Sequence, residues 1–116
     1  MATAEELKAS LMDFEENYNA NPKLKTMNRD WNRKVRVKAT DVAVEYGLDL
    51  KDGVVRFLEQ PPAEPDLVVA SDGETLTSMF YGEVSPSEPY MDGTLKVTGS
   101  EEDLIRLDFV TAMIWG

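Results

Sequence analysis

The sequence contains neither cysteine nor histidine. Their absence excludes disulfide bonds, cysteine nucleophiles, Ser-His-Asp triads and zinc sites with nitrogen or sulfur ligands. Carboxylate, hydroxyl, lysine and tyrosine side chains are the groups that remain for acid-base or nucleophilic chemistry. We therefore expect no cofactor and no bound metal, and few kinds of enzyme are compatible with this composition.

Basic residues are also scarce, since 12 lysines and arginines stand against 22 acidic residues and give a formal net charge of −10. This surplus opposes the neutralisation of phosphates on which nucleic-acid binding depends, so we expect no DNA or RNA partner. Long apolar runs are missing too, because no stretch approaches the roughly 20 residues that cross a bilayer. The N-terminus also lacks the basic and apolar regions of a signal peptide. These absences predict an acidic, cytoplasmic protein.

What is present suffices for one folded domain over residues 1–116. Of the 116 residues, 42% are hydrophobic, which is enough to build a core at a length typical of single domains. The sequence shows no internal repeat, no low-complexity tract and no linker long enough to divide the chain.

Two helices are predicted at the start of the chain. Thr3 and Glu6 form a capping-box pattern. An apolar stripe at helical spacing follows it, made of Leu7, Leu11, Phe14 and Tyr18. Asn21 and Pro22 are typical of a second helix start. This second helix is expected to carry three apolar residues on one face, Leu24, Met27 and Trp31.

The pattern then changes to a period of two residues, which is typical of strands with one buried face. It predicts strands over 33–39, 42–50 and 54–59, with a tight hairpin turn at Gly53. An unbroken apolar run predicts a further strand over 66–70, covered on both faces.

The last part of the chain is mainly helical in pattern. Ser71 and Glu74 predict a helix after the fourth strand, a short helical turn follows Pro86, and a strand is expected over 94–98. The final helix begins with three carboxylates at the positive end of its dipole, Glu101, Glu102 and Asp103. That helix is apolar around most of its circumference, so we expect it to be covered on more than one side. The whole order predicts an α+β fold with an antiparallel-rich sheet and helices on one face.

Five internal methionines lie in predicted helices: Met12, Met27, Met79, Met91 and Met113. Methionine is flexible and polarisable, so it lines cavities that adapt to varied apolar ligands, but it also fills gaps in ordinary cores. Periodicity does not distinguish a packed interior from a hollow one, and both interpretations stay open at this point.

A basic run near the start of the first strand contains Arg33, Lys34, Arg36 and Lys38. One interpretation is a transient contact with an anionic membrane surface, where each cation adds about 1 kcal/mol. The other is that Lys34, Arg36 and Lys38 form the solvent face of an edge strand, charged to prevent sheets from associating.

Asp92 is the one carboxylate expected near a pocket wall, because it directly follows Tyr90-Met91. A buried aspartate there would serve as the general base of a small isomerase acting on an apolar substrate, with Tyr81 or Tyr90 as hydrogen-bond donor to developing charge. The competing interpretation is an aspartate that caps the turn.

A run of structural residues connects the helix after the fourth strand with the final helix. It reads Gly82-Glu83-Val84-Ser85-Pro86 and then Tyr90-Met91-Asp92-Gly93-Thr94-Leu95-Lys96-Val97-Thr98-Gly99. With the apolar helix that follows, this run resembles the sterol carrier protein 2 (SCP2) family, in which a glycine ends a helix and an aromatic-Met pair precedes a Gly-x-Leu-x-Val-x-Gly strand. The resemblance covers residues 66–116 in motif and the remainder in element order.

The resemblance implies an SCP2-like single domain with a five-stranded, mostly antiparallel sheet and helices on one face that enclose an apolar tunnel. Such a tunnel holds a lipid or fatty acyl chain without covalent chemistry. The apolar residues of the later helices become the candidate tunnel lining. They are Met79, Phe80, Tyr90, Met91, Leu104, Leu107, Phe109, Met113 and Trp115.

The leading hypothesis is a non-enzymatic carrier whose partner is a lipid or other apolar small molecule. Two alternatives from other classes stay open. One is the isomerase with Asp92 as its base, and the other is an interaction module that forms a homodimer or pairs with a partner protein. An exposed Ile114-Trp115 would favour the interaction module.

Overall fold

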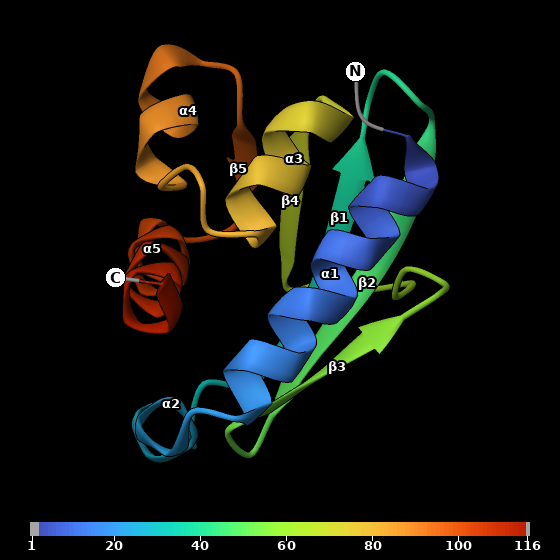
Figure 1. Cartoon of the computed structure of the whole chain (residues 1–116). Helices are drawn as coiled ribbons and strands as arrows, with labels where there is room; N and C mark the ends of the chain where they lie inside the picture. The colour runs from blue at the N-terminus through green and yellow to red at the C-terminus, as the bar shows by residue number, and fades with distance from the viewer. Residues whose placement is uncertain (1–2, 116) are drawn as a thin grey trace.

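The computed structural model of the chain describes residues 3–115, apart from the side chains of Thr111, Ile114 and Trp115. The helices are α1 (Ala4–Asn19), α2 (Pro22–Met27), α3 (Gly73–Phe80), α4 (Ser87–Asp92) and α5 (Glu101–Trp115). The strands are β1 (Arg33–Ala39), β2 (Val44–Lys51), β3 (Val54–Leu58), β4 (Leu67–Ser71) and β5 (Lys96–Thr98). Figure 1 shows α1 and α3 against one face of the sheet, with α5 beside them.

The five strands form one sheet in the order β3-β2-β1-β4-β5. The pairs β1–β2, β2–β3 and β4–β5 are antiparallel, while β1 and β4 are parallel. The predicted α+β fold with a mostly antiparallel, five-stranded sheet is therefore confirmed. Because β1 lies in the middle of the order, the prediction that its cations guard an edge strand is wrong.

The two faces of the sheet differ as the alternating pattern requires. Val35, Val37 and Ala39 of β1 are buried beneath the helices. The opposite face of β1 is charged, and there Lys34 pairs in register with Asp49 and Lys38 with Glu45. Opposite charges directly across strands stabilise an antiparallel pair, so this polar face is compatible with solvent.

The turn between β2 and β3 forms at the predicted hairpin. Asp52 and Gly53 both have positive φ, at 54° and 79°, which a type I′ turn requires. A Cβ at Gly53 would lie 2.3 Å from the Lys25 carbonyl oxygen. The turn therefore packs directly against α2, and only glycine fits there.

The first helix begins with the predicted capping box. The Thr3 backbone N–H donates to Glu6 Oε1 at 3.0 Å, and the Glu6 N–H donates to Thr3 Oγ1 at 3.1 Å. The second helix is shorter than predicted, because it ends at Met27. Asn28 is buried at its end, and its side chain is held by Tyr18 and by Arg106 of α5. These tertiary hydrogen bonds fix the residue after the helix and leave Trp31 in an irregular segment.

The predicted start of α3 is displaced by one residue. Asp72, not Ser71, is the N-cap, since its Oδ1 accepts a hydrogen bond from the Thr75 N–H at 2.7 Å. Ser71 is the last residue of β4, and its hydroxyl donates to the Thr94 carbonyl at 3.0 Å.

The final helix is covered on one side only, contrary to the expectation from its composition. Leu104, Leu107 and Val110 face inward and are buried, whereas Ile105 is 67% exposed and Phe109 49% exposed. This leaves an apolar strip of α5 on the surface of the molecule. The outer face of the helix thus carries exposed apolar residues as well as the exposed Glu101 and Glu102.

Candidate functional site

A closed apolar pocket lies between the sheet and the helices and is called here the closed interior. Its lining residues come from α1, α3, α5, three strands and the segment before β1. They are Phe14, Trp31, Val35, Leu48, Leu50, Leu67, Val69, Phe80 and Leu107. Among these described residues none is titratable, so the lining offers dispersion contacts and no acid-base group.

The closed interior is small, with a free volume of about 10 Å³. A cavity needs about 10–15 Å³ by such a measure to hold one water molecule. The open tunnel that the resemblance implies is therefore not seen in this structure. An acyl chain or sterol would require the lining to move apart.

Aromatic rings fill much of the space beside the closed interior. The rings of Phe14 and Phe80 meet edge to face, with 5.3 Å between centroids and 74° between planes. Tyr18 lies 5.8 Å from Phe14 on the same helix. Such pairs contribute about 0.5–1.5 kcal/mol beyond their buried area, so displacing Phe80 has a definite energetic cost.

Five of the candidate lining residues are buried or partly buried, and two of these line the closed interior. Phe80 and Leu107 line it directly. Met79 is buried in the core cluster, Leu104 is buried on α5, and Met113 is partly buried against the core.

Three other candidates do not line the closed interior. Tyr90 and Met91 lie on α4 and are 36% and 85% exposed. Phe109 is on the outer strip of α5 and lines an open groove instead. For Tyr90 and Met91 the reason is geometric, because α4 packs against α5. The Trp115 side chain, like that of Ile114, lies outside the described residues.

The strands supply most of the lining that the candidate set missed. Val35, Leu48 and Leu50 stand on the inward face that the two-residue period already predicted. That period was the signal that would have found them. Trp31 had no such signal, because its spacing from Met27 is helical while its segment is not.

An open groove of about 460 Å³ lies between α2 and α5 and is called here the α2–α5 groove. It is lined by Met27, Trp31, Arg33, Glu102, Asp103, Ile105, Arg106 and Phe109. Two cations and two carboxylates balance one another in this lining, and the rest of it is apolar. Trp31 belongs both to this groove and to the closed interior.

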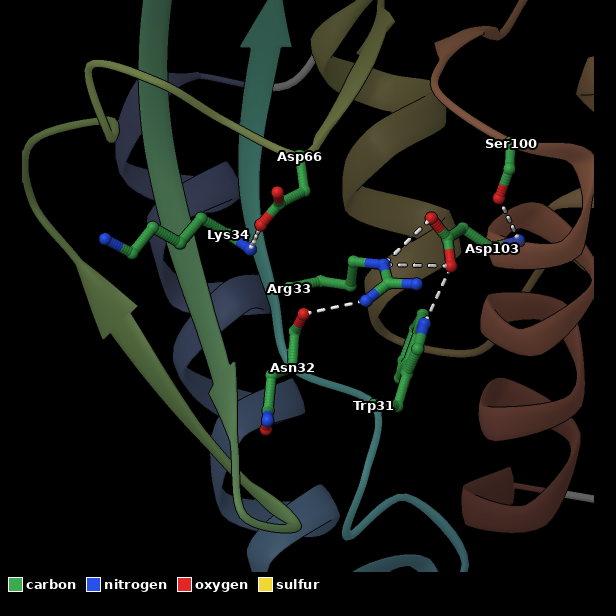
Figure 2. Close-up of polar contacts among 7 residues, drawn as sticks. All are labelled: Trp31, Asn32, Arg33, Lys34, Asp66, Ser100 and Asp103. Carbon is green, nitrogen blue, oxygen red and sulfur yellow. Dashed lines mark hydrogen bonds and ion pairs between the residues drawn. The ribbon is translucent and has the colours of Figure 1, made fainter.

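A polar network joins α5 to the segment before β1, as Figure 2 shows. The Trp31 Nε1–H donates to Asp103 Oδ1 at 2.8 Å. The Arg33 Nε–H donates to both oxygens of Asp103, at 3.2 and 3.1 Å. Ser100 Oγ accepts from the Asp103 backbone N–H at 3.2 Å.

The environment of the Asp103 carboxyl favours its charged form. Burial acts to raise its pKa, but the hydrogen bonds from Trp31 and Arg33 and the Arg33 charge bring the pKa below its ordinary value. The carboxylate is therefore a stable acceptor near neutral pH, and its hydrogen bonds are of the strong, charge-assisted kind.

Arg106 completes the contact between α5 and this segment. Its guanidinium lies 5.5 Å from the centroid of the Trp31 ring, which is within range of a cation–π interaction. Its Nη1–H donates to Asn28 Oδ1 at 2.8 Å, and Asn28 donates to the Tyr18 hydroxyl at 3.0 Å. Burial raises the pKa of Tyr18 despite these neighbours, so its hydroxyl stays neutral.

The basic run does not form one surface. Figure 2 shows Arg33 pointing toward α5, while Lys34 points away from it. Arg36 lies with Lys34 on the charged face, pairs with Glu45 at 3.3 Å and donates to the Pro62 carbonyl. The alternation of the strand separates Arg33 from the others, so a joint membrane contact through Arg33, Lys34, Arg36 and Lys38 is not supported.

The structure removes the basis for Asp92 as a general base. Asp92 is exposed and accepts a hydrogen bond from the Thr94 N–H at 2.8 Å. Hydrogen bonds from Thr94 lower its pKa, whereas a base poised near neutral pH needs a raised one. It caps the turn before β5, and the isomerase interpretation is wrong.

Over residues 3–115, no helix has both the length and the apolar content to cross a membrane. The same residues contain no cluster of three or more carboxylates arranged to hold a metal ion.

One family model matches most of the chain. The model of the SCP-2 sterol transfer family matches residues 11–109. Hydroxysteroid dehydrogenase-like protein 2 from Bos taurus is 28% identical over 83 residues, which span 62% of this chain and 20% of that protein. The chain thus corresponds to about a fifth of the length of this curated relative.

Two solved structures resemble almost the whole chain. UbiJ-SCP2, described as a ubiquinone synthesis protein, has a TM-score of 0.73 at 16% identity and covers 92% of this chain and 94% of its own. Palmitated SCP2L2 from Aedes aegypti has a TM-score of 0.67 at 16% identity and covers 95% of each chain. At such identities, these likenesses show a common fold.

Proposed function

Because the chain belongs to the SCP-2 sterol transfer family, we propose that it is a carrier that binds an elongated apolar molecule in the closed interior. The observation that carries this proposal is the wholly apolar, untitratable lining contributed by the sheet and three helices. A site without acid-base groups supports binding and release of the ligand, not covalent chemistry.

The energetics are favourable once the lining has opened. Each methylene transferred from water into such a site gains about 0.8 kcal/mol. The cost is the separation of packed side chains, since the free volume is about 10 Å³. A ligand with a long chain buries enough methylenes to offset that cost, whereas a short ligand does not. A fatty acid or a sterol is therefore the expected class.

Binding is tested first with the wild-type protein. Lipid-stripped protein is titrated with cis-parinaric acid, a naturally fluorescent fatty acid, and the probe is displaced with palmitate or cholesterol. Organic extracts of the freshly purified protein are examined by mass spectrometry for co-purified lipid. Absence of both probe binding and co-purified lipid would contradict the proposed function.

A matched pair of variants on β4 then locates the site. Val69 lines the closed interior, while Val68 is its neighbour on the opposite face of the strand. Val69→Phe fills the space that the ligand needs and is expected to weaken binding, at a stability cost of about 1–3 kcal/mol. Val68→Phe adds the same ring outside and is expected to leave the affinity unchanged. Equal effects of the two variants would place the ligand elsewhere.

A further inference from the structure

The indole of Trp31 forms a wall between the closed interior and the α2–α5 groove. Trp31 is the one described residue that lines both spaces, and it is 5% exposed. The two spaces are therefore separated by the thickness of one side chain. If the indole turned away, they would become a single passage from the surface to the apolar lining.

Trp31 is also the lining residue least restrained by the backbone. It lies in the segment 28–32, between α2 and β1, outside any helix or strand. Leu50, another lining residue, also faces an outer pocket. Leu50 is paired with Arg33 on one side and Val55 on the other, so the sheet ladder holds it in place. Of these two residues, Trp31 is the one whose side chain can move without breaking the hydrogen bonds of the sheet.

Trp31 is held in place by two residues of α5 that lie one turn apart. Asp103 accepts the indole N–H, and Arg106 lies over the ring. Residues three apart on a helix share one face, so both act on Trp31 from the same side. Outward rotation of the indole breaks one charge-assisted hydrogen bond and one cation–π contact, and it leaves the Arg33–Asp103 pair intact.

The α2–α5 groove is suited to receive an apolar chain before it enters. Met27, Ile105 and Phe109 form its rim and are exposed. The wider cleft of about 740 Å³ beside α3 and α4 is different, because it is lined by four carboxylates and shares no described residue with the closed interior. Those four are Asp72, Glu74, Glu88 and Asp92. An apolar chain gains nothing from a carboxylate-lined wall.

We propose that the α2–α5 groove is the ligand entrance and that Trp31, held closed by Asp103, is the gate through which an apolar chain reaches the closed interior. The inference rests on the proposed function, because a gate requires a ligand-binding interior. To that function the gate adds the route by which the ligand enters, the order in which the ligand contacts the groove and the interior, and the residue that limits the rate of ligand exchange.

The first test measures exchange rates by stopped-flow fluorescence with cis-parinaric acid. Trp31→Phe keeps a ring in the wall but removes the donor to Asp103. Since the gate closes over both free and loaded protein, association and dissociation are both expected to accelerate, by about tenfold for the loss of one hydrogen bond to a charged group. Trp31 also lines the closed interior, so the dissociation constant is measured separately, and the acceleration of association is the readout of the gate. Tyr81→Phe, which removes a polar group from an exposed ring elsewhere, is the matched control and keeps the wild-type rates.

The second test locks the entrance without touching Trp31. The chain has no cysteine, so Met27→Cys with Ile105→Cys gives a unique pair across the groove for a reducible bifunctional thiol reagent. Linked protein is expected to lose exchange, and reduction is expected to restore it. The control pair, Lys8→Cys with Glu59→Cys, replaces a surface ion pair away from the groove and should exchange normally when linked.

The outcomes separate the two proposals. If wild-type protein binds no fatty acid, the proposed function fails. If it binds but Trp31→Phe and the linked groove both exchange at the wild-type rate, the gate is wrong and the function stands. Should Trp31→Phe not fold, the cysteine pair decides alone, because Met27 and Ile105 are exposed.

Discussion

Replacing Phe80 by alanine tests whether the closed interior is a site that a ligand must open. Phe80 is buried, lines the closed interior and packs edge to face on Phe14. Loss of a buried phenylalanine side chain costs about 3–5 kcal/mol of unfolding free energy. Domains of this size have about 5–15 kcal/mol in total, so Phe80→Ala is expected to remain folded in the absence of denaturant.

The same substitution has the opposite effect on ligand binding. Removal of the Phe80 ring leaves an empty volume at the lining, and this volume is part of the space that palmitate needs. The dissociation constant for palmitate is therefore expected to fall. At a palmitate concentration about 100 times the dissociation constant, binding adds about 2.7 kcal/mol to the unfolding free energy. Urea unfolding with and without palmitate, followed by circular dichroism, measures both quantities.

Leu76→Ala is the control on the same helix. Leu76 is fully buried but does not line the closed interior. Its truncation also costs about 2–5 kcal/mol, yet the affinity for palmitate should not improve. If Phe80→Ala and Leu76→Ala change the affinity alike, the reasoning is refuted, because destabilisation in general and not space at the lining would then control binding.

Three further predictions concern stability. Folding lowers the pKa of Asp103, so the contribution of this carboxylate to the unfolding free energy is present above about pH 4 and is lost as the pH falls through the folded-state pKa. Asp103→Asn should therefore reduce the difference between the urea midpoints measured at neutral and at acid pH. Folding raises the pKa of Tyr18, so the contribution of its neutral hydroxyl to the unfolding free energy is lost as the pH rises above about 10. Above that pH, Tyr18→Phe should lose less stability than the wild-type protein. Thr3→Ala removes the α1 cap and should lower the unfolding free energy by about 1 kcal/mol, with Thr3→Ser restoring it; an unchanged thermal midpoint would contradict this role.

Local patterns in the sequence were sufficient to predict most elements of the fold. The two-residue period located β1, and positive φ at Asp52 and Gly53 confirms the hairpin. The period does not show where a strand stands in its sheet, because Lys34 and Lys38 alternate in the same way at an edge or in the centre. The central place of β1 depends on its parallel pairing with β4, which no local pattern encodes.

The candidate site was less accessible to sequence reasoning for a similar reason. Asp103 stands among three carboxylates at a helix start, where the dipole alone explains it. Its particular role comes from Trp31, 72 residues earlier in the chain. Trp31 in turn has helical spacing from Met27, but α2 ends at Met27 and the residue after it, Asn28, is buried. Both features depend on tertiary contacts, as does the exposure of Met91.

The central claim is that an apolar ligand occupies the closed interior, and nuclear magnetic resonance tests it most directly. Palmitate is added to protein with isotope-labelled methyl groups, and intermolecular nuclear Overhauser effects are recorded from its chain. We expect effects to the methyls of Val35, Leu48 and Val69, which line the closed interior. Effects confined to the exposed Ile105 and Met91, with none to the inner methyls, would contradict the claim.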